Sequence, residues 1–448
     1  MKRTFTFTLA VLLAAGTCLS GAAMAQVPSD AIRKAVKDKK DKPSAPEKRP
    51  GDDVTDPTMI KPITETIVGR VIKQEDVRAM IVDIDLRVDG YSRIRPDRSI
   101  VSELIKFQTA AVIFPVPPVT ATSNGIDPAG PDYRAEVMFD GAAIGSKPTV
   151  ITGYAGGQKY AKWAVTDMEA RTMLLRMQLP VTCAKVVFDE QLALSVPWPK
   201  GDYPADAKST FQIQLGVDYI HTVALTPDVQ RAATEKIIDE LMKTWTNGED
   251  PKKLGPVYLA KFLTGQVLEL IQPSGDGLAF NRNTSFQGFS LQGAAETLTS
   301  KKGSEFDITC ALAAVFRRAG LPTRVVIGWD RIGEGGGSRR ERFRSWVEFA
   351  IVDPISSTEV WVPVDVVKQR RVSSRAGALD RKWDYFGGID DLQQTIPLTF
   401  HFHPPTTVDN AGAPCLWGWL TTPTSQIAQQ TMTLNARVAP ARGGQPKR

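Results

Sequence analysis

The most hydrophobic stretch of the chain predicts a helix that is buried on nearly every side. Over residues 306–319, apolar side chains occupy positions all around the helical turn instead of one stripe. Ser304, with Asp307 three residues later, is typical of a capping box, although Glu or Gln is the preferred third residue. Gly320 is expected to end the helix, and residues 325–327 then predict a core strand. A central buried helix therefore leads into a sheet.

The first half of the chain alternates between apolar and polar residues, as half-buried strands do. Residues 81–88, 171–179 and 211–215 show this two-residue period, and Asp-Gly and Gly-Gly pairs separate the segments. We therefore expect residues 60–222 to form an N-terminal β-sandwich domain.

Helices and further strands surround the central helix in the second half. Thr226 followed by Pro227 predicts a helix start, and a second helix is expected over residues 253–271. The core stripe predicted for the first of these helices consists of Val229, Ala233, Ile237 and Leu241. Strands are predicted at residues 343–352, 359–366 and 398–403. The fold class expected for the whole chain is α+β.

Three short motifs follow one another in this half. Gly303 and residues 317–324 (Arg-Arg-Ala-Gly-Leu-Pro-Thr-Arg) form the first, residues 344–348 (Arg-Ser-Trp-Val-Glu) the second, and residues 361–365 (Trp-Val-Pro-Val-Asp) the third. In order and spacing they resemble the motifs of the transglutaminase-like family, whose fold is papain-like. The resemblance extends over about residues 226–400. It implies a papain-like core with the buried helix packed on an antiparallel sheet.

The resemblance also implies a catalytic Cys, His and Asp, but this sequence departs from that set. Glu305 stands at the Cys position and Arg344 at the His position, whereas Asp365 matches. A carboxylate is a poor nucleophile for acyl transfer, and Arg stays protonated and cannot act as a base. We predict that Glu305, Arg344 and Asp365 form a salt-bridge network in a relic, inactive site.

Cys310 is the alternative nucleophile. It lies five residues beyond Glu305, a net rotation of about 140° around the helix, and so points away from the other two positions. His401 and His403 share one strand face, but without acidic or thiol partners they make a weak metal site. We expect neither a cofactor nor a metal. The sequence leaves open a cysteine-dependent peptidase or amide acyltransferase that uses Cys310.

The amino-acid composition adds to these predictions mainly at the N-terminus. Residues 1–25 have the charged, apolar and Ala-x-Ala parts of a secretory signal, and residues 26–59 are polar and charged, typical of a disordered linker. Removing the signal lowers the formal net charge from +6 to +4, since Lys2 and Arg3 are its only charged residues. This mild charge permits an anionic partner without demanding one. We expect an exported protein, periplasmic or extracellular, with no integral membrane segment after signal cleavage.

The remaining predictions concern domains, thiols and partners. Residues 223–405 are expected to form the transglutaminase-like domain, and residues 406–448 a partly disordered extension. Three cysteines remain after signal cleavage, an odd number, and the pairing of Cys183 and Cys415 stays open. No nucleotide loop or nucleic-acid motif is visible. Five arginines near the relic site either face solvent or hold an anionic group: Arg331, Arg339, Arg340, Arg342 and Arg344. A non-catalytic protein would bind a peptide, a protein or an anionic cell-envelope polymer.

Overall fold

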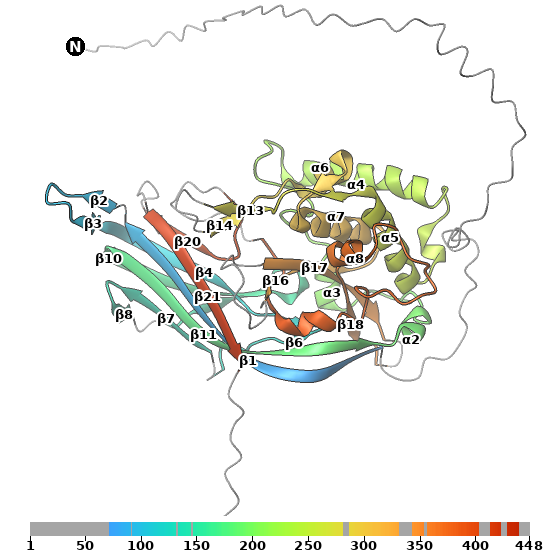
Figure 1. Cartoon of the computed structure of the whole chain (residues 1–448), viewed down its shortest axis with the longest axis horizontal. Helices are drawn as coiled ribbons and strands as arrows, with labels where there is room; N and C mark the ends of the chain where they lie inside the picture. Colours follow the sequence, from blue (N-terminus) through green and yellow to red (C-terminus); the bar gives the residue numbers. More distant parts are fainter. Residues whose placement is uncertain are drawn as a thin grey trace, which may run out of the picture. The chain divides into compact units, whose positions relative to one another are not determined.

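The computed structural model describes residues 71–90, 92–130, 133–144, 147–280, 286–330, 343–353, 356–402, 413–422 and 428–438. The predicted signal and linker, His403 and the arginines between residues 331 and 342 lie outside these ranges. The described chain is a mixed α+β structure with more strand than helix (Figure 1).

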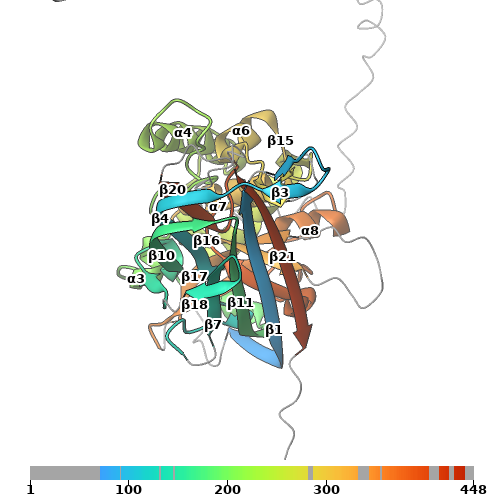
Figure 2. The same cartoon turned by 90° about the vertical axis from the view of Figure 1, so that its left-hand side faces the viewer.

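Two sheets of long antiparallel strands are built from residues 72–188 together with two C-terminal strands, and we call them the front sheets. The five-stranded sheet has the order β21-β1-β11-β7-β8, and the four-stranded sheet has the order β20-β4-β10-β9. The bounds are β1 Ile72–Gly90, β4 Ile105–Val116, β7 Arg134–Phe139, β8 Ala142–Ile144, β9 Thr149–Ile151, β10 Lys159–Ala170, β11 Thr172–Phe188, β20 Gly418–Thr422 and β21 Ala428–Val438. Figure 2 shows β1, β11 and β21 side by side.

The two-residue period of the sequence explains these strands. Along β1, Val82, Ile84 and Leu86 are buried and alternate with more exposed polar residues. Buried residues from both sheets belong to one hydrophobic cluster that continues into the helical region. The strands predicted at residues 81–88 and 171–179 are therefore confirmed. The β-sandwich itself stays a prediction.

Two strands lie within residues 406–448, which we predicted as a partly disordered C-terminal extension. Strand β20 pairs with β4, and β21 pairs with β1 along the register Met80↔Val438 to Gly90↔Ala428. Trp419, Met432 and Leu434 are buried there. The last strands thus complete both front sheets. Pairing partners that lie more than 300 residues apart leave no local signal in the sequence.

One local prediction fails, and another holds only in part. Residues 211–215 follow the short helix α3 (Ala205–Ser209) as turns, and within the described chain only an isolated bridge at Leu215 pairs them. Helix α4 (Pro227–Trp245) begins as predicted, with Thr226 as N-cap, but Val229 is 51% exposed. Of the predicted stripe, Ile237 and Leu241 are partly buried and pack against the core, whereas Ala233 is exposed. The fully buried residues of α4 are Thr234 and Ile238. Contact with α6 and α7, and not apolar character alone, selects the buried stripe.

The central helix α7 (Glu305–Arg318) is confirmed, and its surroundings explain its composition. One side packs on β16 (Thr323–Asp330) and β17 (Phe343–Val352), and the other sides contact α4, α5 (Pro256–Leu270) and α6 (Gly293–Ser300). Every residue from 306 to 317 is buried. A helix enclosed by a sheet and three helices needs apolar residues on all sides.

The core sheet has the order β18-β17-β16-β19, with β18 at Glu359–Val364 and β19 at Thr395–Thr399. The closing strand, expected over residues 398–403, therefore begins three residues earlier and shares only residues 398 and 399 with the prediction. The short elements are β2 Ser92–Ile94, β3 Ile100–Ser102, β5 Val119–Thr120, β6 Ser123–Asn124, η2 Ala155–Gly157, α2 Glu190–Leu194, η3 Pro251–Lys253, β12 Gln272–Pro273, β13 Leu278–Phe280, β14 Phe286–Phe289, β15 Lys302–Gly303, α8 Val366–Val372 and η4 Asp390–Gln394.

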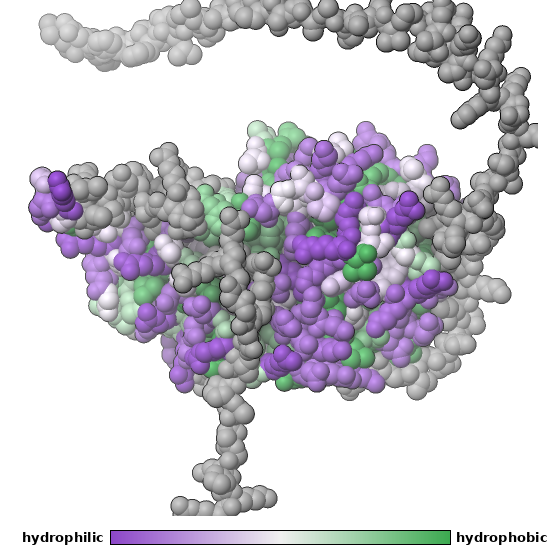
Figure 3. Space-filling model, in the orientation of Figure 1, coloured by the Kyte–Doolittle hydropathy of each residue, from purple (hydrophilic) through white to green (hydrophobic). Residues whose placement is uncertain are grey.

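Two further observations concern the helices and the surface. None of the described helices combines the length and the apolar character that a membrane span requires. On the face drawn in Figure 3, hydrophilic residues dominate over the helical region, and hydrophobic ones form small separate patches.

Candidate functional site

The N-terminus of α7 is held by a reciprocal capping box. The Ser304 hydroxyl accepts a hydrogen bond from the Asp307 N–H, and the Asp307 carboxylate accepts one from the Ser304 N–H at 3.1 Å. The same carboxylate accepts the Gln292 N–H at 2.9 Å, just before α6. Asp therefore serves where Glu or Gln is usual, because it also binds the neighbouring helix start. This fixes Glu305 as the first residue of α7.

Glu305, which the motif resemblance places at the nucleophile position, is largely buried. One carboxylate oxygen accepts the Ser345 N–H at 3.3 Å, and the other lies 3.6 Å from the Arg371 guanidinium. The Glu305 side chain is 25% exposed, whereas Arg371 is 67% exposed. Burial, with help from the negative charge of Asp365, raises the pKa of Glu305 to about 7. Glu305 therefore exchanges a proton near neutral pH.

Arg344, which the motif resemblance places at the His position, is enclosed by acceptors. Its Nε donates to Asp365 Oδ2 at 2.9 Å, Nη2 donates to Asp391 at 3.0 Å, and Nη1 donates to the Thr395 hydroxyl at 3.1 Å. Its side chain is only 2% exposed. Burial would lower its pKa, but the carboxylates of Asp365 and Asp391 outweigh burial and leave the pKa raised. Arg344 is thus a fixed cation.

The structure corrects our picture of one network through all three positions. Arg344 and Asp365 pair as predicted, and their charges act on the pKa of Glu305. Among the described residues, however, no ion pair within 4 Å joins Glu305 to Arg344, and Glu305 instead faces Ser345 and Arg371. The helix start and the Arg344 cluster are neighbouring but separate. Their descent from a catalytic site stays a prediction.

Asp391 and Thr395 are the partners that sequence reasoning missed. They come from η4 and β19, about 50 residues after Arg344, and no spacing rule connects them to it. Asp391 also pairs with Lys368, and the two cations outweigh burial and lower the Asp391 pKa. The only available signal was the expectation that a buried Arg needs more than one acceptor.

The surroundings of Cys310 do not suit a nucleophile. Its side chain is fully buried, and burial, followed by the Asp307 charge, raises its pKa well above the ordinary value. A Cβ added to Gly216 would lie 3.1 Å from the Cys310 sulfur, so the thiol faces that backbone. His401 contacts the Ala155 carbonyl through Nε2 at 2.8 Å. A desolvated thiol remains protonated and inert.

The described cysteines are Cys183, Cys310 and Cys415, and all three are buried. Burial raises the pKa of Cys183 to about 12. In the part of the chain that the structure describes, no group of three or more His, Cys, Asp or Glu side chains is arranged to hold a metal ion.

A second buried ion pair uses two other motif residues, Arg324 on β16 and Glu348 on β17. Their closest approach is 2.7 Å, and the side chains are 4% and 0% exposed. Arg324 also donates to the Val119 carbonyl at 3.1 Å, and Glu348 accepts the Ala121 N–H at 3.1 Å. This ion pair therefore joins the core sheet to the segment from Val119 to Ala121, which precedes it by about 200 residues.

Aromatic rings complete the surroundings of Arg324. Its guanidinium lies 3.8 Å from the Trp361 ring centre and 4.1 Å from that of Phe400. Stacking on two rings stabilises a cation that has left water.

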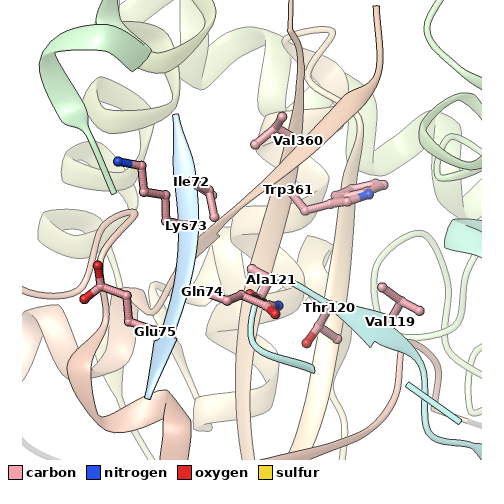
Figure 4. A pocket seen from close by; sticks show the side chains of 9 residues that line it. All are labelled: Ile72, Lys73, Gln74, Glu75, Val119, Thr120, Ala121, Val360 and Trp361. Carbon is pink, nitrogen blue, oxygen red and sulfur yellow. Dashed lines mark hydrogen bonds between the residues drawn. The ribbon is translucent and has the colours of Figure 1, made fainter. Parts of the chain in front are cut away.

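Beside this pair lies a cavity of about 750 Å³, which we name the β18 groove. Its lining residues are Ile72, Lys73, Gln74, Glu75, Val119, Thr120, Ala121, Val360 and Trp361. In Figure 4, Ile72 and Gln74 point toward β18, whereas Lys73 and Glu75 point away from it. A second cavity of about 430 Å³ shares Val119 and Trp361 with the groove and reaches Arg324. Neither cavity is lined by Glu305.

Solved structures show weak similarity to this chain. One, described as a candidate cysteine protease from Cytophaga hutchinsonii, is 12% identical with a TM-score of 0.45, over 83% of this chain and 94% of that one. Another, described as a candidate protease from Parabacteroides distasonis ATCC 8503, is 10% identical with a TM-score of 0.20, over 53% of this chain and 41% of that one. No curated protein matches the chain.

The family comparison covers the segment that holds the site. The model of the transglutaminase-like superfamily matches residues 274–366, which include Glu305, Arg344 and Asp365. The fold around them is the expected one, with α7 packed on an antiparallel sheet. This part of the chain is therefore a domain of the transglutaminase-like superfamily.

Proposed function

We propose that this is an exported, non-catalytic transglutaminase-like protein that binds a peptide, a protein or an anionic cell-envelope polymer, or acts as a scaffold. The observation that carries the proposal is the state of the two substituted positions. Arg344 is locked between Asp365, Asp391 and Thr395, and Glu305 occupies the helix N-terminus.

The chemistry of these groups argues against acyl transfer. A guanidinium whose pKa is raised cannot take a proton from a nucleophile. Glu305 is partly protonated near neutral pH, and its two oxygens already face Ser345 and Arg371. Neither residue can replace the proton shuttle that a His supplies.

The rival function, an enzyme built on Cys310, has less support. Its nucleophile would have to react from a fully buried position with a raised pKa. His401 is engaged with Ala155, and His403 lies outside the described residues.

The front of the chain supports a binding or scaffold role. We interpret its two sheets as a β-sandwich, and the Arg324–Glu348 pair fastens it to the core through backbone groups of Val119 and Ala121. A fixed junction of this kind suits a protein that presents a surface.

Activity assays on the full mature chain test the proposal. We expect neither hydrolysis of a casein substrate nor incorporation of a fluorescent primary amine into casein above the buffer rate. The matched variant is Glu305→Gln, which keeps the size of the side chain but cannot ionise. Turnover by the wild-type chain that this variant abolishes would overturn the proposal.

Restoring the family residues gives a positive control. In the double variant Glu305→Cys and Arg344→His, the introduced thiol would lie at the N-terminus of α7, and the introduced imidazole would replace the side chain that now pairs with Asp365. We expect iodoacetamide to alkylate this introduced thiol in the folded protein, while Cys310 stays unmodified. Export is tested separately, by mass spectrometry of the N-terminus of the protein recovered outside the cytoplasm, which we expect to begin at Gln26.

A further inference from the structure

Strand β18 is the edge strand of the core sheet, and only part of its outer side is covered. The Gly387 N–H donates to the Pro363 carbonyl at 2.8 Å, and the Asp365 N–H donates to the Tyr385 carbonyl at 3.0 Å. Both bonds belong to one antiparallel bridge between Val364 and Phe386. The backbone groups of residues 363 and 365 therefore point outward, away from β17.

Strand geometry extends this assignment along β18. Its register with β17 runs without a break from Val347↔Val364 to Val352↔Glu359. Because alternate residues direct their N–H and C=O groups to the same side, those of Trp361 and Glu359 also point outward. Within the described chain, no backbone hydrogen bond from another segment reaches these outward groups.

The β18 groove lies beside these open positions. Val360 and Trp361 line it, and no residue of β17 does, which places the groove at the outer side of β18. Its opposite wall comes from residues 72–75 of β1, which pair with β11, whereas β21 joins β1 from Met80 onward. Among the described residues, the groove therefore runs between two strand segments whose facing backbone groups have no strand partner.

We propose that an extended peptide segment of a partner protein adds as a strand to β18 in this groove, pairing with Trp361 and Glu359. This inference rests on the binding function proposed above and names its ligand class. Outward N–H and C=O groups at the spacing of a strand are matched in register by another extended backbone. Free anions and compact sugars do not reproduce that spacing.

The groove walls fit alternate side chains of such a peptide. Ile72, Val119 and Trp361 supply apolar surface, and Lys73 and Glu75 point away from β18 in Figure 4. Natural edge strands are commonly guarded by charges or by Pro. Here Pro363 lies at the covered part of the edge, beside Gly387. The open part carries one charge, Glu359, and its carboxylate accepts hydrogen bonds from the Ala207 N–H and the Trp361 ring N–H.

The first experiment uses a phage-displayed library of random octapeptides, panned on the full chain. The tightest peptide is then synthesised with a fluorescent label, and its affinity is measured by fluorescence anisotropy. Two analogues carry N-methyl groups on one or the other alternate set of amides. We expect one analogue to bind at least about tenfold more weakly and the other to bind nearly as well, because only one set faces β18. Equal affinities for both analogues, or no peptide recovered from the library, would overturn the proposal.

Two variants of one residue test the protein side. Trp361→Ala removes the ring but keeps the outward N–H, whereas Trp361→Pro removes both. Pro is tolerated on an edge strand where its missing N–H faces outward, so β17 pairing should survive. We expect the Pro variant to bind the selected peptide about five- to tenfold more weakly than the Ala variant. Equal binding by two folded variants would contradict strand addition, and the analogue series remains decisive if either fails to fold.

Hydrogen exchange of the full chain without peptide tests the groove's occupancy. We expect fast exchange at the amides of Trp361 and Glu359, and slow exchange once the peptide is added. Amides that are protected before addition would show that the chain's own segments cover the edge, which would overturn the proposal. Mass analysis of the bound peptide separates the two proposals: a cleaved peptide refutes the non-catalytic function but leaves docking intact.

Discussion

Strand β17 carries two buried charges on one face, Arg344 near its start and Glu348 four residues later, roughly 13 Å along the strand. Each is nearly inaccessible and each is hydrogen-bonded to an oppositely charged side chain. The partners differ. Arg344 binds Asp365 and Asp391 of the same core, whereas Glu348 pairs with Arg324, and both bind the backbone of the front region.

This difference separates two uses of family motif positions. Arg324 and Glu348 join the core sheet to the backbone of Val119 and Ala121. The charge of Arg344 is instead compensated by Asp365 and Asp391, which hold the side chain in place. A buried ion pair is not in itself strong evidence of stabilisation, because desolvation offsets attraction. The two pairs are therefore best compared by removing one partner from each and measuring the change in the free energy of unfolding.

The largest effect is expected from Glu348→Ala. It leaves the Arg324 guanidinium, 4% exposed, without its carboxylate and the Ala121 N–H without its acceptor. We expect a loss of about 3–5 kcal/mol in the free energy of unfolding, measured with guanidinium chloride. The control is the double variant Arg324→Met and Glu348→Leu, which should lose less than Glu348→Ala. A single-variant loss below about 1 kcal/mol would contradict the role of this pair.

Arg344→Met should have a somewhat smaller effect. Asp365 loses its cation but still accepts the Lys368 N–H at 2.8 Å, and Asp391 keeps Lys368. We expect a loss of about 2–4 kcal/mol in the same unfolding assay. Arg344→Lys, which keeps the charge but not the fork of donors, should recover part of it. An unchanged stability would show that the cluster is dispensable.

The third prediction concerns pH. The pKa of Glu305 is about 7 in the folded protein against an ordinary 4.5, so the folded state holds an extra proton between these values. Stability contributed by this group therefore falls as pH rises from about 4.5 to 7. Glu305→Gln removes this dependence and should raise the free energy of unfolding by about 1–2 kcal/mol at about pH 8, with little change at about pH 4.5.

Chemical denaturation of wild type and Glu305→Gln at several pH values checks this. The expected gain is smaller than the full pKa shift implies, because the side chain is 25% exposed and solvent screens its charge. If the free energies of unfolding of the variant and the wild type differ by the same amount at acidic and at alkaline pH, then lost contacts and not titration cause the effect.

The smallest effect is expected from Cys310→Ala. The side chain is fully buried, and removing its sulfur should lower the free energy of unfolding by about 1 kcal/mol. In the wild-type chain, iodoacetamide with peptide mapping should modify Cys310 only after unfolding. Fast labelling of the folded protein at neutral pH would revive the enzyme hypothesis.

The sequence by itself determined the elements that depend on local patterns. All-round apolar composition identified α7, the alternating residues identified β1 and β11, and motif order led to the transglutaminase-like domain. The same motifs led to Glu305 and Arg344 as candidate site residues. These features depend on near neighbours in the chain, which periodicity records.

Only the tertiary structure decided which distant segments meet. It placed β20 and β21 in the front sheets, shifted the closing strand to β19, and surrounded Arg344 with Asp391 and Thr395. It also separated Glu305 from Arg344 and, within the described chain, left part of the outer edge of β18 open. Strand pairing and buried charge compensation depend on contacts between residues far apart in the sequence, and local composition carries no record of which partner is chosen.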